Sequence, residues 1–428
     1  MKSILLVSIC TVSLLVALAA PDGLAAQEQN PAPIHYTVTD LGTLGGTFSL
    51  GYGINHSGLV AGVATVSNGN QHAYTWYRGT ITDLGTLGGA NSVGINQPNS
   101  RDEVPIISEI STSDPLGENF CNFGTGLICL GATWQAGVMT ALPTLGGNNA
   151  EAFALNNPGQ IAGVAENGTH DPSCLAPQVL DFEAVIWEPD GQIRELPSLP
   201  GDTVGFALGI NDVGEAVGST GSCANTPLQL PYGPHAVLWK HGFPINLGSL
   251  GGSTESTGAS INDREEVIGA SVLADNQTVH SFLWTRETGM RDIGTLPGDA
   301  SSLGGFINNL GQVVGWSCNS GGNCRAYIWQ NGVMTDLNAL VPPTSPLYLV
   351  IAFGINDAGE IVGQATQKST GDAHAFLLTP VRHQGSGANS ALKDVDAASS
   401  PFTLPDAIRE TLPREMNGRL AVRTLGLR

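Results

Sequence analysis

Short apolar runs separated by turn residues follow one another along most of this 428-residue chain. In one representative stretch the runs cover residues 303–308, 312–316, 325–329 and 333–337, with Gly, Asn or Asp between them. The runs are rich in β-branched and aromatic residues, and no segment keeps a 3.6-residue apolar period. We therefore predict short β-strands joined by hairpins. Four such strands, numbered first to fourth, make one unit.

The unit recurs seven times, and Gly-Ile-Asn or a close variant marks the end of each first strand. The asparagines lie 41 to 60 residues apart, at Asn55, Asn96, Asn156, Asn211, Asn262, Asn308 and Asn356. A period of roughly 40–60 residues predicts a repeat architecture. The Asn-Asp-x-Gly sequences at 211–214 and 356–359 predict that the asparagine caps a tight turn. A calcium loop would need more acidic ligands and a closing Glu, so we assign no metal.

Side-chain size also repeats from unit to unit. Two and four residues before the asparagine the side chain is small in nearly every unit, so one face of the first strand is almost bare. Glycine within a strand marks a close approach of another backbone, which predicts that the first strand is innermost in a ring. One position of the third strand is a tryptophan in six units, and we call it the tryptophan slot. It holds Trp76, Trp134, Trp187, Trp239, Trp284 and Trp329. In four units a histidine precedes this slot, and we interpret the histidines and the tryptophans as structural.

The fourth-strand motif, Thr-Asp-Leu-Gly-Thr-Leu-Gly-Gly or a variant, is offset from the other three strands. Its first copy, at 39–46, precedes any first strand, and the seventh unit ends near residue 378 without a fourth strand. Pairing residues 36–41 with the strand around 374–378 would close the array and leave no open edge. We therefore predict an all-β fold, a seven-bladed β-propeller of four-stranded blades over residues 34–382, and we expect a monomer.

The repeated motifs Gly-Ile-Asn-Asp-x-Gly, His-Ala-Phe-x-Trp and Thr-Asp-Leu-Gly-Thr-Leu-Gly-Gly resemble those of the HAF family of bacterial extracellular repeats. The second motif is best kept at 72–76 and 235–239, and the third at 82–89. The resemblance covers residues 36–380 and implies an exported bacterial protein. It brings no catalytic or binding residues with it. Unit two departs from the pattern between Pro98 and Cys129, which leaves its second strand unplaced.

Both ends of the chain differ from the repeats. Residues 1–26 begin with a basic residue, continue with an apolar run and end in small residues, which predicts a secretory signal peptide cut between Ala19 and Ala26. Residues 383–400 have the composition of a flexible linker. The rest of the tail to residue 428 could form one short helix and is basic, through Arg409, Arg414, Arg419, Arg423 and Arg428.

Charge and cysteine content narrow the functional classes. The net charge is −20, and residues 34–382 carry ten Lys and Arg against thirty Asp and Glu. Such a surface repels phosphate backbones, so we exclude nucleic acid as a partner. No later stretch is long and apolar enough to span a membrane.

The six cysteines left after cleavage fall in the loops between second and third strands, and we predict the disulfides Cys121–Cys129, Cys174–Cys223 and Cys318–Cys324.

Acidic residues in the connections between successive units are the candidate site. Glu151, Asp202, Glu255 and Asp299 come from four successive connections, and we expect them to form an acidic rim at the channel mouth that binds a cation or sugar hydroxyls. Glycoside hydrolysis needs two carboxyls about 5–9.5 Å apart, which such a rim could supply. The sequence lacks the Gly-x-Ser-x-Gly, His-Glu-x-x-His and phosphate-loop motifs.

Three functions fit these observations. The first is a secreted or periplasmic module that binds a glycan or a cell-envelope surface protein, or serves a structural role there, with no catalytic residue, metal or cofactor assigned. The alternative is a carbohydrate-active hydrolase or lyase that uses the channel-mouth acids. In the third, the tail attaches the ring to a partner during surface assembly.

Overall fold

The computed structural model describes residues 34–226 and 233–381, and all statements below concern these residues. The predicted signal peptide and the tail from residue 383 lie outside them. The described part is built from 28 strands and one short 3-10 helix, η1 (Leu337–Ala339). None of its helices has the length and apolar character needed to cross a membrane.

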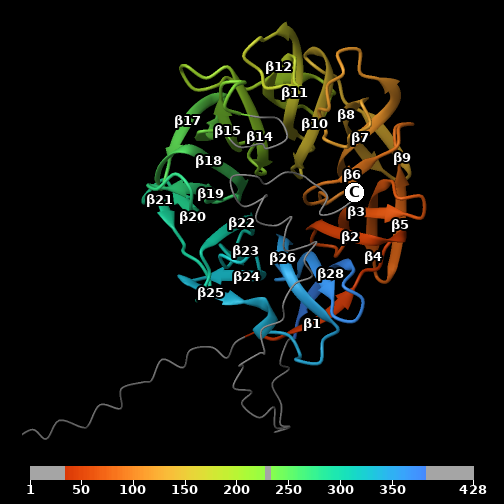
Figure 1. Cartoon of the computed structure of the whole chain (residues 1–428), viewed down its shortest axis with the longest axis vertical. Coiled ribbons are helices and arrows are strands. Elements are labelled where there is room, and N and C mark those ends of the chain that lie inside the picture. The colour runs from red at the N-terminus through yellow and green to blue at the C-terminus, as the bar shows by residue number, and fades with distance from the viewer. Residues whose placement is uncertain (1–33, 227–232, 382–428) are drawn as a thin grey trace, which may run out of the picture. The chain divides into compact units, whose positions relative to one another are not determined.

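The strands form seven four-stranded antiparallel blades around a common centre (Figure 1), which confirms the predicted all-β propeller. Blades 1 to 4 run in order from the inner strand outward: β2 (Gly45–Ile54), β3 (Val60–Val66), β4 (Gln71–Tyr77), β5 (Thr80–Gly85); β6 (Ser92–Gly94), β7 (Val104–Ser113), β8 (Leu127–Gln135), β9 (Val138–Ala141); β10 (Gly146–Leu155), β11 (Ile161–His170), β12 (Leu180–Trp187), β13 (Ile193–Glu195); β14 (Val204–Ile210), β15 (Ala216–Gly221), β16 (His235–Lys240), β17 (Phe243–Gly248).

Blades 5 to 7 follow the same order, and the chain's first strand, β1, completes the last of them. These strands are β18 (Gly251–Ile261), β19 (Val267–Leu273), β20 (Val279–Thr285), β21 (Gly289–Asp292); β22 (Ser301–Ile307), β23 (Val313–Cys318), β24 (Cys324–Gln330), β25 (Val333–Asp336); β26 (Leu347–Ile355), β27 (Ile361–Gln367), β28 (Ala373–Pro380), β1 (Tyr36–Asp40).

The ring closes as the sequence predicts. β1 pairs antiparallel with β28, with Tyr36 opposite Pro380 and Asp40 opposite Phe376. The N-terminal segment therefore supplies the fourth strand that the seventh unit lacks. One parallel pair, Phe48 with Ala373, also links blade 7 to blade 1 in the same sheet.

The first strand of each blade is innermost, and its small residues permit close contact between neighbouring blades. A Cβ atom at Gly53 would lie 2.3 Å from the carbonyl oxygen of Asn96 in the next blade. A Cβ at Gly354 would lie 2.9 Å from the Cα of Gly53. Neither distance is possible for a side chain, so glycine is required where these backbones approach.

Blade 2 differs from the sequence assignment by three residues. The predicted turn asparagine, Asn96, has a positive φ of 62° and follows a first strand of only three residues. The turn is instead formed by Asn99, whose N–H donates to the carbonyl oxygen of Glu103, as that of Asn156 donates to Gln160 in blade 3. The insertion of residues 96–98 displaces the turn, and the second strand, β7, begins at Val104.

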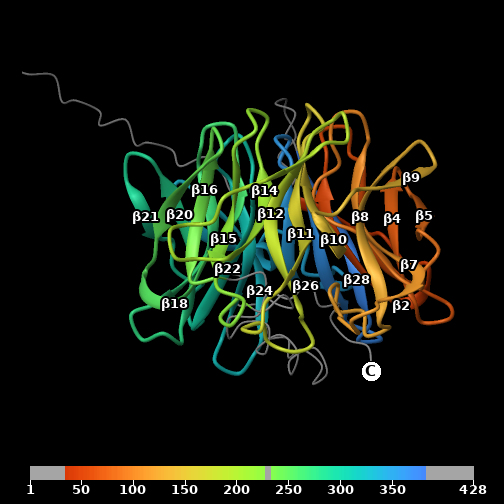
Figure 2. The same ribbon diagram turned by 90° about the horizontal axis from the view of Figure 1, so that it is seen from above.

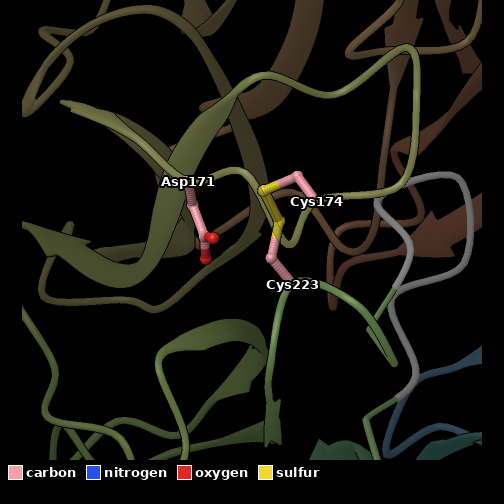
Figure 3. A group of neighbouring side chains, drawn as sticks. All are labelled: Asp171, Cys174 and Cys223. Atoms are coloured by element: carbon pink, nitrogen blue, oxygen red, sulfur yellow. A yellow bond between two sulfur atoms is a disulfide. The ribbon is translucent and has the colours of Figure 1, made fainter.

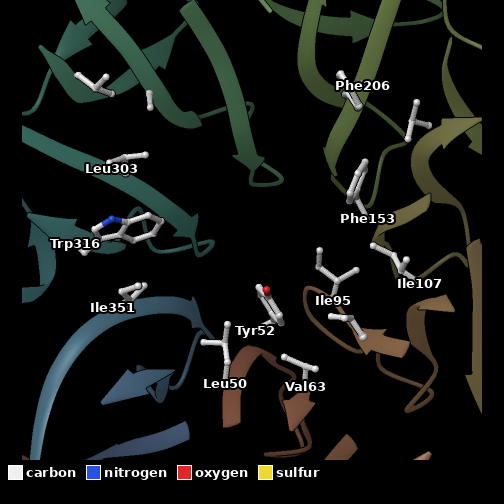
Figure 4. Close-up of a cluster of buried hydrophobic side chains, with 14 of the residues drawn as sticks. Leu50, Tyr52, Val63, Ile95, Ile107, Phe153, Phe206, Leu303, Trp316 and Ile351 are labelled. Atoms are coloured by element: carbon white, nitrogen blue, oxygen red, sulfur yellow. The ribbon is translucent and has the colours of Figure 1, made fainter. Parts of the chain in front are cut away.

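Apolar side chains from all seven blades fill the interior of the ring. Figure 4 shows part of this cluster, in which side chains such as Tyr52, Phe153 and Trp316 surround the centre. Farther out, Trp239 belongs to one cluster with Ala184 and Ile186 of the preceding blade. The repeated tryptophan slot therefore packs blade against blade, as predicted.

The third-strand histidines are structural groups. The Nδ1 atoms of three of them contact aspartates of the fourth strands at 2.8–2.9 Å, in the pairs His72–Asp83, His280–Asp292 and His374–Asp40. The last of these pairs crosses the ring closure. Each aspartate also accepts the backbone N–H of the glycine two residues later, which explains the recurrence of Asp and Gly at this spacing.

Each blade presents its connections on two opposite faces, because neighbouring strands are antiparallel (Figure 2). The turns after the first and third strands lie on one side, which we call the turn face. The loops between second and third strands, with the connections between blades, lie on the other side, which we call the loop face.

Candidate functional site

The turn face is hollowed at the ring axis. The axial hollow has a volume of about 90 Å³, and every blade contributes to its lining. Blades 3 to 7 do so through the end of the first strand and the turn that follows, blade 1 through His56, and blade 2 through residues 96–99. Backbone and side-chain polar groups of the turns surround it, and Phe306 adds an aromatic ring. The hollow is therefore a polar site assembled from equivalent positions of seven units.

Seven asparagines form a closed inner ring around the hollow. The Nδ2 of each donates a hydrogen bond of 2.9–3.5 Å to the backbone carbonyl oxygen of the equivalent asparagine in the next blade. The circuit ends where it began, since Asn356 donates to the carbonyl oxygen of Asn55. Its members are Asn55, Asn99, Asn156, Asn211, Asn262, Asn308 and Asn356.

Asn156 shows why the repeat requires asparagine. Its Oδ1 accepts the backbone N–H groups of Gly159 at 3.0 Å and Gln160 at 2.7 Å, which fixes the turn. Its Nδ2 donates to the Asn211 carbonyl oxygen and to Gln160 Oε1, both at 2.9 Å. All four hydrogen-bonding positions of the amide are used. Aspartate would lose both donors, so it cannot replace asparagine here without loss.

A second set of residues, which we call the mouth ring, comes directly after these asparagines. From blade 2 to blade 7 the backbone N–H of each member donates to a side-chain oxygen of the next, at 2.7–3.0 Å. These contacts fix the carboxylate and amide groups before any ligand arrives. The mouth ring consists of His56, Ser100, Asn157, Asp212, Asp263, Asn309 and Asp357.

The mouth ring is acidic. Asp212, Asp263 and Asp357 line the hollow, and each accepts a backbone N–H from the preceding blade. Its one basic member is His56, whose half-exposed ring places Nε2 3.6 Å from Asp357 Oδ2. Carboxylates accept hydrogen bonds and attract positive charge. The arrangement can therefore hold hydroxyl, ammonium or guanidinium groups.

The four acids predicted from the sequence lie elsewhere, and none lines the axial hollow. Glu151 and Glu255 fall within the first strands β10 and β18, because these strands begin early and contain bulges. Asp202 and Asp299 lie in connections between blades, and each binds a basic side chain of the blade that follows its connection. Asp202 contacts His235 Nδ1 at 2.8 Å, and Asp299 contacts Arg325 Nη2 at 2.9 Å. Their role as ligand-binding residues stays a prediction.

Glu151 differs from the other three acids in its surroundings. The residue is buried, and burial raises the pKa of its carboxyl to about 8. A carboxyl in this state holds its proton at neutral pH. Glu151 is therefore a potential proton donor.

The loop face carries the three predicted disulfides, which the structure contains. Cys174–Cys223 joins the loops of blades 3 and 4, as expected. The Asp171 carboxylate lies within 4.8 Å of both sulfur atoms (Figure 3). This group does not form a metal site while the bond is intact, because metals bind the thiolate form of cysteine.

A repeated polar residue in the sequence indicates where the mouth ring lies. Asn or Asp follows the ring asparagine in five of the seven units, at Asn157, Asp212, Asp263, Asn309 and Asp357. Treating these residues only as turn caps overlooks that the first strand is innermost. A polar group repeated at the end of an innermost strand must lie near the axis.

Comparisons with known proteins give the fold alone. No family model matches the sequence, and no curated protein does. A gluconolactonase from Xanthomonas campestris is 10% identical with a TM-score of 0.38, over 82% of this chain and 96% of that one. A prolyl endopeptidase is 11% identical with a TM-score of 0.46, over 78% and 51%, so this chain spans about half its length. The SapL1 lectin is 11% identical with a TM-score of 0.34, over 68% and 96%.

Proposed function

We propose that this chain is a non-catalytic binding module that works at or outside the cell envelope and takes its ligand in the axial hollow of the turn face. The mouth ring is the observation that carries this proposal. Its carboxylate and amide groups are held by hydrogen bonds from neighbouring blades, so little conformational freedom is lost when a ligand binds. Preorganised acceptors of this kind favour recognition.

The chemistry of the mouth favours a ligand with hydroxyl groups and a positive charge. Asp212 and Asp263 accept two hydrogen bonds each from protein groups, and their oxygens retain further acceptor positions. Val213 and Leu310 lie next to the mouth ring and are 70% and 61% exposed, which offers apolar contact beside the charges. An amino-sugar unit of an envelope glycan combines these properties, and we propose that class of ligand.

Two observations support a location at or outside the envelope. The chain holds three disulfides, which is consistent with an extracytoplasmic location. The resemblance of its repeats to the HAF family, together with the leader-like residues 1–26, implies export.

A glycan array screened with the full chain tests the proposal. We expect binding to glycans with amino-sugar units, and a loss of at least about tenfold in affinity in the double variant Asp212→Asn, Asp263→Asn. Asp190→Asn is the matched control, since it removes one charge from an exposed third–fourth turn of the same face. Binding that survives the double variant, or no binding to any glycan, would contradict the proposal.

One observation favours the second candidate function, a carbohydrate-active hydrolase or lyase. The raised pKa of Glu151, about 8, is what a general acid at neutral pH requires. In this reading Glu151 acts with Asp202. Release of reducing ends from glycans found on the array, lost in Glu151→Gln, would support it. Unchanged glycan binding by Glu151→Ala and Asp202→Ala would remove both acids from the list of ligand contacts.

A further inference from the structure

The chain leaves the ring on the turn face, close to the mouth ring. β28 runs antiparallel to β27, so its last residues lie beside the start of β27 and the turn of blade 7. Pro380 is in contact distance of that turn, since a Cβ at Gly359 would lie 3.4 Å from its Cγ. Gly359 and Asp357 belong to the same four-residue turn. The segment that follows residue 381 therefore begins beside the turn that contains Asp357.

The last thirteen residues have the composition that this site would bind. Residues 416–428 read Met-Asn-Gly-Arg-Leu-Ala-Val-Arg-Thr-Leu-Gly-Leu-Arg and contain three arginines and no acidic residue. Apolar side chains stand between the arginines. The turn face offers the complement, with three aspartates at the mouth and the exposed Val213 and Leu310 beside them.

The length of chain between the two places permits the contact. Residues 382–415 separate the ring from this segment. An extended chain of that length reaches at most roughly 115 Å, far beyond the contact distance from which it starts. A tethered segment also acts at a high effective concentration, on the order of millimolar for short tethers.

We propose that residues 416–428 dock on the turn face of their own ring, with an arginine guanidinium in the axial hollow against Asp212, Asp263 and Asp357. The inference rests on the proposed function, because it makes the segment a competitor for the same ligand site. Arginine suits the place, since its planar group forms paired hydrogen bonds with carboxylates. Arg101 and Arg264 also lie on this face, but their guanidinium groups bind Asn157 O and Glu266.

Binding of a labelled peptide of residues 416–428 to two forms of the full chain tests this docking. The tail variant Arg419→Gln, Arg423→Gln, Arg428→Gln has a vacant site, and we expect it to bind the peptide at least about tenfold more tightly than the wild type, whose own segment competes. Added salt should weaken the binding. Peptide binding that is absent from the tail variant, or equal in both proteins, would overturn the proposal.

Substitutions on the ring locate the contact. Asp212→Asn, Asp263→Asn and Asp357→Asn, each made in the tail variant, should lower peptide affinity several-fold, and Asp190→Asn should leave it unchanged. Asparagine keeps an oxygen for the backbone N–H of the preceding blade, so the mouth ring can persist, and thermal unfolding checks that it does. Equal affinity in all four variants would refute docking at the mouth.

Two further readouts separate the alternatives. A concentration-dependent dimer of the wild type, absent from the tail variant in sedimentation, would show that the segment occupies a second copy and would overturn docking in cis. Glycan binding by the tail variant distinguishes the two proposals. Peptide binding without glycan binding keeps this inference and defeats the proposed ligand, and the reverse result defeats this inference alone.

Discussion

The turn face and the loop face hold their polar groups in opposite ways. On the turn face the same asparagine recurs in every blade, and its bonds form one circuit from Asn55 back to Asn55. On the loop face, the loops between second and third strands are held by polar groups that are not repeated from blade to blade. Glu118, fully buried, accepts the N–H groups of Val179 and Leu180 from the next blade through Oε1, and its buried Oε2 has no hydrogen-bond partner.

The difference shows two ways to join neighbouring sheets. The repeated asparagine contacts are uncharged and have the same geometry in every blade. They therefore cost little desolvation free energy. The irregular loops are held by unique buried carboxylates and by disulfides. Glu166, also fully buried, illustrates the cost, because burial first and the charge of Glu118 second raise its pKa to about 8. The turn face carries the axial hollow in which we propose that a ligand binds, and the irregular loops of the loop face carry the disulfides.

The largest expected effect comes from removing the Cys174–Cys223 disulfide of the loop face. Replacing Cys174 and Cys223 by serine releases a loop closed over a sequence separation of 49 residues. Loop-closure entropy predicts a loss of about 4 kcal/mol in the free energy of unfolding. Denaturant unfolding measures it. The double variant Cys318→Ser, Cys324→Ser, with a separation of 6, should lose less, and an equal loss would contradict the entropic explanation.

A single atom change should break the circuit on the turn face. Asn211→Asp removes donors to the Asn262 carbonyl oxygen and to Glu215, and places a carboxylate against both. We expect a loss of about 3 kcal/mol in the free energy of unfolding. Asn96→Asp is the matched control, because Asn96 looks equivalent in sequence but lies outside the circuit. Asn99→Asp should resemble Asn211→Asp; if Asn96→Asp were the more harmful, the reassignment of blade 2 would be wrong.

The buried carboxylates of the loop face predict a fall in stability at alkaline pH. The pKa of Glu166 is about 8 in the folded state, above its ordinary value of 4.5, so its contribution is present below 4.5 and is lost as pH rises through 8. Glu118→Gln keeps an acceptor for Val179 and Leu180 and removes the neighbouring charge. We expect it to reduce the loss of stability between pH 5 and 9 by about 1–2 kcal/mol.

Thermal unfolding at several pH values follows this change. Glu287→Gln removes a charge from an exposed position and should leave the pH dependence as in the wild type. An equally steep decline in Glu118→Gln would show that Glu118 does not control the titration of Glu166.

The His280–Asp292 pair should give the smallest effect. The hydrogen bond that His280 donates to Asp292 raises the pKa of His280, and the burial of His280 opposes the shift. Burial would raise the pKa of Asp292, but the hydrogen bonds from His280 and Gly294 outweigh it and lower the pKa. The pair therefore contributes above the folded pKa of Asp292, which lies below 3.8, and is lost as pH rises through that of His280, above 6.5.

Replacing His280 by Gln measures this contribution. Asp292 is 39% exposed, so after allowance for solvent screening we expect a loss of about 0.5 kcal/mol between pH 4 and 6.5, and a smaller loss once the pH exceeds the pKa of His280. His170→Gln, outside the repeated pairs, is the control. A loss that is the same at every pH would mean that His280 acts by packing rather than by charge.

Most of the fold could be predicted from the sequence because short sequence motifs repeat in every unit and mark each strand and turn. The offset of the Asp-Leu-Gly motif predicted the pairing of β1 with β28, and matching loops predicted Cys174–Cys223. The candidate site was harder to predict. Glu151 and Glu255 were expected in connections, yet bulges draw them into β10 and β18. Bulges depend on the neighbouring strand and leave no clear trace in one sequence.

The sequence by itself determined the number of blades, the closure of the ring and the pairs of cysteines, because repetition and offset are properties of a one-dimensional pattern. Only the tertiary structure decided that Asn99 replaces Asn96, and that ring asparagines donate to residues 44 to 57 positions ahead, with Asn356 donating back to Asn55. The same holds for the acidic hollow on the turn face. These features depend on the register between blades, which the packing of whole sheets sets.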